Sequence, residues 1–226
     1  MSDAVKRPIA GCLGCVVGSA LLAHLAFRAE GFGRLDATVL SRLSDRHGSL
    51  AGPVASFFSF LADPLPQLVM LALACFVALR RGLPRHAVAA VVLVAGANLT
   101  TQALKVVLEH HRYQPILGYS QVGPTAFPSG HATAALAMAC AFALVVPRAW
   151  RPAAISLGVL ATLAVGCSRV ILHHHYPSDV LGGWLVAAGW CFAVVAALRV
   201  SEELRSQRGL GRWGEGRNER SSQNDT

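Results

Sequence analysis

Apolar segments of membrane-spanning length recur along this 226-residue chain, and no other feature constrains its fold as strongly. The hydrocarbon core of a bilayer is about 30 Å thick, so a spanning helix needs about 20 mostly apolar residues. Six segments are close to that length, at about residues 8–27, 51–79, 86–108, 130–146, 152–172 and 180–200. The sequence therefore predicts an all-α fold of six transmembrane helices, with both termini on one side of the membrane.

The composition agrees with a membrane environment and disfavours two other classes of protein. Hydrophobic residues make up 54% of the chain and charged residues 14%, whereas soluble proteins carry about 25% charged residues. The net charge of +8 does not indicate a nucleic-acid partner, because the basic residues lie in short clusters between apolar runs. The six cysteines also lie in apolar runs. We interpret them, including the CxxC pair Cys12 and Cys15, as buried hydrophobic residues rather than metal ligands.

Three local patterns define the organisation of the chain. Two prolines in Asp63-Pro64-Leu65-Pro66 predict a break in the second segment. Residues 35–46 place their leucine and valine side chains on one helical face, which predicts an amphipathic helix on the membrane surface. The polar chain after Val200 predicts disorder. We expect three parts, namely a transmembrane and surface-helix region, a core of five transmembrane helices and a disordered cytoplasmic tail, at residues 1–50, 51–200 and 201–226.

The distribution of loop lysines and arginines predicts the orientation. Most of them lie on the side of the two termini, and cytoplasmic loops carry the excess of positive charge. We therefore expect a multi-pass protein of the cell membrane with both termini in the cytoplasm. The loops after the first, third and fifth spans then face outward.

Three clusters of polar residues map to that outer side. They comprise Lys105 with Arg112, then Pro128-Ser129-Gly130-His131, and then Ser168-Arg169 followed by His175 and Asp179. A phosphoryl group requires such a set, because its transition state spreads negative charge over three oxygens that fixed cations must stabilise. Cations of this kind are Lys105, Arg112 and Arg169.

The remaining members of the clusters fit the other needs of phosphoryl transfer. Ser129 and Gly130 open a helix whose free N–H groups can bind an anion. The spacing of Asp179, four residues after His175, lets its carboxylate hold the ring Nδ1–H and leave Nε2 free to attack phosphorus. His131 then suits the general acid that protonates the leaving oxygen.

These three motifs resemble the type 2 phosphatidic acid phosphatase family, which shares its core with the vanadium haloperoxidases. The resemblance covers about residues 51–200. It departs from the family pattern where Tyr113 follows Arg112 in place of a proline. The resemblance implies a six-helix fold, a phosphohistidine intermediate on His175, and no metal cofactor, and we expect no other cofactor. With the orientation given above, we expect the active site at the outer end of the bundle.

Some residues keep more than one interpretation. His173 and His174, with His110 and His111, suggest a metal site, but consecutive helical residues point about 100° apart and rarely converge on one ion. We expect these four histidines to be interfacial or supporting residues. Asp63 either orients a loop or touches the substrate.

The expected activity is hydrolysis of a phosphomonoester or a terminal pyrophosphate bond in a membrane lipid, with the bilayer itself as the other partner. Undecaprenyl diphosphate is the leading candidate substrate, and phosphatidic acid and phosphatidylglycerol phosphate stay open. A lipid phosphotransferase would use the same first step. A transporter or metal-binding membrane protein would instead spread its charges across the bilayer midplane. The sequence does not predict the oligomeric state.

Overall fold

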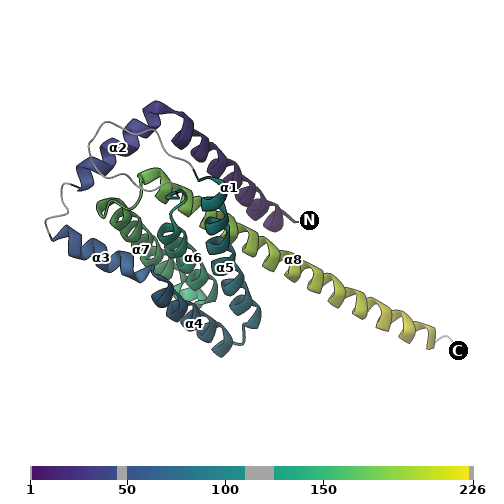
Figure 1. The fold of residues 1–226 in the computed structure, drawn as a ribbon. Coiled ribbons are helices and arrows are strands. Elements are labelled where there is room, and N and C mark those ends of the chain that lie inside the picture. The colour runs from purple at the N-terminus through teal and green to yellow at the C-terminus, as the bar shows by residue number, and fades with distance from the viewer. Residues whose placement is uncertain (1, 45–49, 110–124, 224–226) are drawn as a thin grey trace.

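The computed structural model describes residues 2–44, 50–109 and 125–223, and within these ranges it is all-helical (Figure 1). This confirms the predicted all-α class. The elements in chain order are α1 (Asp3–Arg28), α2 (Glu30–Ser44), α3 (Ala51–Leu61), α4 (Pro64–Arg80), α5 (Pro84–Val107), α6 (Gly130–Val145), the 3-10 helix η1 (Arg148–Trp150), α7 (Arg151–Ile171) and α8 (Pro177–Gln223).

Within the described ranges, four helices are long and apolar enough to cross a membrane. They are α1, α5, α7 with η1, and the part of α8 up to Gln207. The bent pair of α3 and α4 makes a fifth candidate if both helices form one span. The apolar helix α6 has 16 residues. The predicted sixth span therefore depends on a helix slightly shorter than the usual length and stays a prediction.

The centre of the bundle is α6, which packs against α4, α5, α7 and α8. Small side chains fill most of the buried contacts between these helices, including Ala74, Ala78, Ala90, Ala97, Ala137, Ala141 and Ala187. Large apolar side chains such as Leu13, Val17, Phe76, Val88 and Leu157 point outward. This is the pattern expected in lipid, where helices associate by close backbone approach rather than by burying large apolar residues.

The proline-containing break occurs where the sequence predicts it. Helix α3 ends at Leu61, α4 begins at Pro64, and the two axes differ by 52°. Proline is favourable at the first helical position because that residue needs no N–H donor. Asp63 is left at the corner between the two helices.

The amphipathic helix is present but begins earlier than expected and is attached to the bundle. Helix α2 starts at Glu30, and its Leu40 and Leu43 pack against a small core cluster near the ends of α7 and α8. Its Asp36 is only 5% exposed and accepts hydrogen bonds from the backbone N–H and the hydroxyl of Ser178. The helix therefore rests on protein at this point.

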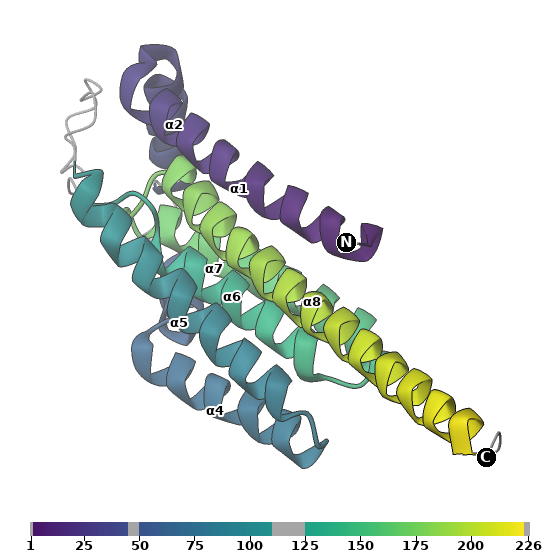
Figure 2. The same cartoon turned by 90° about the vertical axis from the view of Figure 1, so that its right-hand side faces the viewer.

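The prediction of a disordered tail after Val200 is wrong as far as Gln223, because α8 continues to that residue. The extension contains no proline and begins with Glu202, Glu203 and Leu204, which favour helix. Helix α1 runs beside α8 (Figure 2), and Arg199 donates a hydrogen bond of 2.8 Å to the carbonyl of Ala4. The start of α1 thus lies next to the part of α8 that follows the apolar segment.

Candidate active site

A cavity of about 550 Å³ brings most of the predicted site residues together. Its polar lining residues are Gln67, Asn98, Gln102, Lys105, Gly130, His131, Arg169 and His175, and its apolar lining residues include Leu68, Leu71, Val94 and Ala134. A second, larger cavity of about 740 Å³ lies between α1, α5 and α8, and its lining is almost wholly apolar. The chemistry therefore belongs to the smaller cavity, into which three sequence motifs converge.

The start of α6 forms one side of the site. Ser129 is the N-cap of α6, and its hydroxyl accepts a long hydrogen bond of 3.4 Å from the N–H of Ala132. The first backbone bond of the helix runs from Thr133 N–H to Ser129 O, so the N–H of Gly130 precedes the helical ladder. An N–H in that position can bind an anion.

The backbone of Ser129 is also fixed to α8. Its N–H donates to the carbonyl of Asp179 at 2.9 Å. Gly183, one turn further along α8, lies so close that a Cβ atom there would stand 2.5 Å from the Ser129 carbonyl oxygen. The second and third motifs are therefore in direct, closely packed contact.

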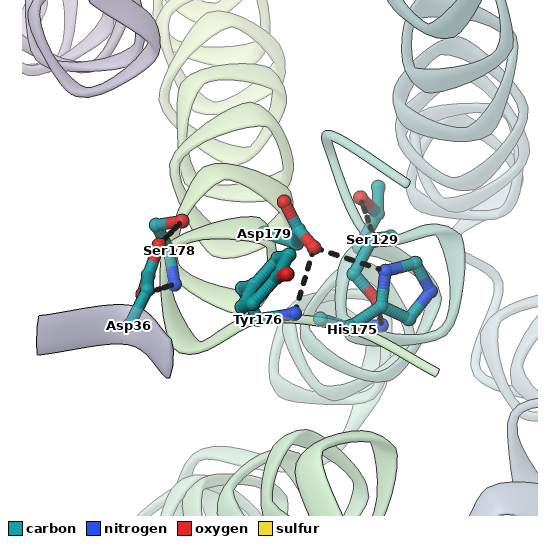
Figure 3. Close-up of polar contacts among 8 residues, drawn as sticks. Asp36, Ser129, His175, Tyr176, Ser178 and Asp179 are labelled. Atoms are coloured by element: carbon teal, nitrogen blue, oxygen red, sulfur yellow. Dashed lines mark hydrogen bonds and ion pairs between the residues drawn. The ribbon is translucent and has the colours of Figure 1, made fainter. Parts of the chain in front are cut away.

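His175 lies in the turn between α7 and α8, and its ring is 7% exposed (Figure 3). Its Nδ1 is 3.5 Å from Oδ2 of the fully buried Asp179, an ion-pair distance longer than a good hydrogen bond. The same carboxylate oxygen accepts the N–H of Tyr176 at 2.8 Å. The ring and the carboxylate therefore lie at ion-pair distance, and the predicted hydrogen bond from Nδ1–H is not formed in this arrangement.

Burial determines the charge of this ring. It lowers the pKa of His175 below its usual range, and the nearby carboxylate of Asp179 opposes this effect without cancelling it. The imidazole is therefore neutral near pH 7. A neutral ring keeps the Nε2 lone pair that a nucleophile needs.

His131 has a partner that the motifs do not contain. Its Nε2 lies 2.9 Å from Oδ1 of Asp63, at the corner between α3 and α4. The two residues are 68 positions apart, so no local spacing in the sequence could show that they meet. The only signal was an acidic residue in a proline-rich break.

Arg169, near the end of α7, reaches the same corner. Its Nη1 donates to the hydroxyl of Ser59 in α3 at 2.6 Å. Its Nε is buried and has no hydrogen-bond partner within the described residues. The guanidinium is therefore held at one nitrogen and can donate another to a phosphate oxygen. Sequence reasoning identified Arg169 but missed Ser59.

The structure describes seven of the eight predicted site residues. Lys105 is half-buried near the end of α5 and lines the cavity. Arg112 lies outside the described residues, as do Tyr113, His110 and His111. Among the residues that are described, no group of three or more histidine, cysteine, aspartate or glutamate side chains could hold a metal ion.

Comparison with known proteins gives a family, two curated relatives and one fold. The family model described as the PAP2 superfamily matches residues 86–202, which is more than half of the chain. Lipid A 1-phosphatase of Rhizobium etli is 43% identical over 72 residues, covering 32% of this chain and 28% of the relative. Lipid A 1-phosphatase of Rhizobium johnstonii is 38% identical over 86 residues, covering 38% of this chain and 32% of the relative. The chain thus matches about a third of the length of these relatives.

One solved structure has the same fold. It is a transmembrane PAP2-type phosphatidylglycerolphosphate phosphatase from Bacillus subtilis, which superposes with a TM-score of 0.71. The two sequences are 18% identical, and the match covers 84% of this chain and 96% of the other.

Proposed function

We propose a reaction for this chain, which belongs to the PAP2 superfamily: hydrolysis of a phosphate group on a membrane lipid through a phosphohistidine intermediate on His175. The observation that carries the proposal is the cavity that Lys105, Gly130, His131, Arg169 and His175 line together. It combines a neutral buried nucleophile, fixed cations and a proton donor, which is what phosphoryl transfer requires.

In the first step, Nε2 of His175 attacks phosphorus, and the bond between phosphorus and the leaving oxygen breaks. The leaving oxygen takes a proton from His131. Lys105, Arg169 and the N–H of Gly130 stabilise the charge on the other phosphate oxygens, and we expect Arg112 to join them. Asp179 stabilises the positive charge that develops on the ring of His175.

In the second step, water attacks the phosphohistidine and gives a proton to His131. The bond between Nε2 and phosphorus breaks, and inorganic phosphate leaves. Every group in this cycle is a side chain or backbone amide of the protein, so we propose that the reaction needs no metal and no cofactor.

A lipid substrate is supported by the mixed polar and apolar lining of the cavity. Its catalytic end carries Lys105 and His131, whereas Leu71 and Val94 line an apolar part. Leu68, also in the wall, is 64% exposed on the outside of the helix bundle. A phosphorylated head group fits the polar end while its hydrocarbon chain extends toward the bilayer.

Several lipid phosphates are candidates for the substrate. Undecaprenyl diphosphate and phosphatidic acid come from the sequence resemblance. The names of the compared proteins support phosphatidylglycerol phosphate and add the 1-phosphate of lipid A. We further propose six spans, with both termini in the cytoplasm and the site at the outer end of the bundle.

The test is phosphate release by purified protein in detergent with a chelator present, offering the four lipids in parallel. We expect release from at least one lipid, no release by His175→Ala, and nearly normal release by His174→Ala, the exposed neighbour in the same histidine run. Activity that depends on an added divalent metal would contradict the metal-free mechanism. A phosphorylated alcohol in place of free phosphate would identify a phosphotransferase.

A further inference from the structure

The corner between α3 and α4 contacts the active site at two points, although no sequence motif includes it. Ser59 accepts a hydrogen bond from Arg169, and Asp63 pairs with His131. Both residues lie outside residues 86–202, the part that the family model matches. One short segment therefore supports a phosphate-binding cation and the proton donor.

The local sequence explains why the carboxylate of Asp63 points away from its own helix. Asp63 is the N-cap of α4, with extended φ and ψ of −69° and 158°, yet its side chain makes no capping hydrogen bond. An N-cap aspartate usually accepts from the N–H of the second or third helical residue. The third residue here is Pro66, which has no N–H, so only the N–H of Leu65 could receive the cap. The carboxylate makes no such bond and pairs with His131 instead.

This contact decides which ring nitrogen of His131 does the chemistry. Since Oδ1 of Asp63 lies 2.9 Å from Nε2, that nitrogen carries the hydrogen that the carboxylate accepts. Nδ1 is then the nitrogen that meets the substrate. Hydrogen bonding at one ring nitrogen fixes the tautomer and orientation of the other, and the negative charge stabilises the imidazolium.

We propose that Asp63 is the positioning residue of His131, so that the site contains a second histidine–aspartate pair which serves the leaving group. This inference rests on the proposed function. When the bond between phosphorus and the leaving oxygen breaks, the proton on Nδ1 of His131 moves to that oxygen. Nε2–H stays with Asp63 throughout. In the second step Nδ1 takes a proton from the attacking water.

Ser59 provides a contrast within the same corner. It contacts Arg169, whose charge acts on phosphate oxygens that stay with phosphorus whatever the leaving group is. Asp63 acts through a proton that only a poor leaving group needs. The leaving group of the substrate therefore separates the two roles.

The experiment measures kcat/KM, which reports on the first chemical step, for a lipid phosphomonoester and for p-nitrophenyl phosphate. Nitrophenolate leaves without a proton. We expect Asp63→Ala to lower kcat/KM for the lipid about 10- to 100-fold, a part of the roughly 10²- to 10⁴-fold contribution of a general acid. The same variant should lower kcat/KM for p-nitrophenyl phosphate by less than about threefold. Ser59→Ala, the matched control, should lower both values by the same factor.

Two results would overturn the proposal. The first is a kcat/KM for the lipid that is unchanged in Asp63→Ala but lowered in His131→Ala. The second is an equal loss of kcat/KM on both substrates in Asp63→Ala, which a purely structural role would give. Asp63→Asn keeps an acceptor oxygen, so it should show a smaller loss of kcat/KM that again affects the lipid more than p-nitrophenyl phosphate. This variant replaces Asp63→Ala if thermal unfolding shows that the alanine variant does not fold. Wild-type activity of His175→Ala would instead refute the proposed function.

Discussion

The two histidine–aspartate pairs differ in separation, exposure and geometry. His175 and Asp179 are four residues apart, 7% and 0% exposed, and separated by 3.5 Å. His131 and Asp63 are 68 residues apart, 25% and 45% exposed, and separated by 2.9 Å. A nucleophile benefits from burial, because a dry ring stays neutral and reactive. A group that exchanges protons with a leaving oxygen and with water must be reachable by both.

The largest expected effect comes from removing the proposed nucleophile. His175→Ala should lower kcat on the order of 10⁴-fold or more on every substrate, because the proposed phosphohistidine can no longer form. No phosphorylated protein should form when labelled substrate is added and the reaction is quenched. Labelled protein in this variant would show that another residue is the nucleophile.

Replacing the proton donor should have a smaller effect that depends on the substrate. His131→Ala should lower kcat/KM for a lipid phosphate by about 10²- to 10⁴-fold. With p-nitrophenyl phosphate the first step is largely spared but the second is slow, so phosphohistidine should accumulate in a rapid-quench experiment. Equal impairment on both substrates, without accumulation, would remove the distinction between the two pairs.

The pH profile should separate the pairs more finely. Because burial lowers the pKa of His175, its active neutral form should persist on acidification to below its ordinary value of about 6.5. Among the residues that the structure describes, the charged groups acting on this ring are Asp179, Arg169 and Lys105. Asp179 acts to raise the pKa, so Asp179→Asn should move the acid limb of kcat/KM for p-nitrophenyl phosphate to still lower pH. A shift to higher pH would contradict this assignment.

The smallest change tests whether the two pairs share one rigid frame. A Cβ at position 183 would stand 2.5 Å from the carbonyl oxygen of Ser129, next to His131. Gly183→Ala should destabilise the fold by about 1–3 kcal/mol, as overpacking does, and lower kcat without changing the identity of the nucleophile. Gly14→Ala on α1 is the control, since a Cβ there meets nothing within 4 Å. Equal melting temperatures for the two variants would show that the contact is easily relieved.

The spacing of residues along the chain predicted the pair of His175 and Asp179 but not the pair of His131 and Asp63. His175 and Asp179 are four residues apart in the sequence, so a local spacing indicated that they meet, although His175 itself lies just before α8 begins. Asp63 and Ser59 reach the site from the corner where α3 and α4 differ in direction by 52°, and no sequence pattern gives that angle. The break itself was predictable from Pro64 and Pro66.

Two further features of the helices could not be predicted from sequence patterns. The polar stretch after Val200 was expected to be disordered, but α8 continues to Gln223. It does so through Gly209, Gly211, Gly214 and Gly216, which helix propensity disfavours, so no sequence pattern indicated the extension. Burial of Asp36 could not be foreseen, because a charged residue on an amphipathic helix usually faces water and its partner Ser178 is 142 positions away. The role of Arg112 stays a prediction.

The hydrogen bonds between Asp36 and Ser178 have a practical consequence for making shorter versions of the protein. Ser178 directly precedes Asp179, so removing α2 would take away the buried carboxylate to which Ser178, in the first turn of α8, donates two hydrogen bonds. A fragment limited to residues 86–202 would carry all three motifs and lack Asp36, Ser59 and Asp63. We therefore expect that a catalytic fragment needs α2 and the corner between α3 and α4, and so starts well before the first motif.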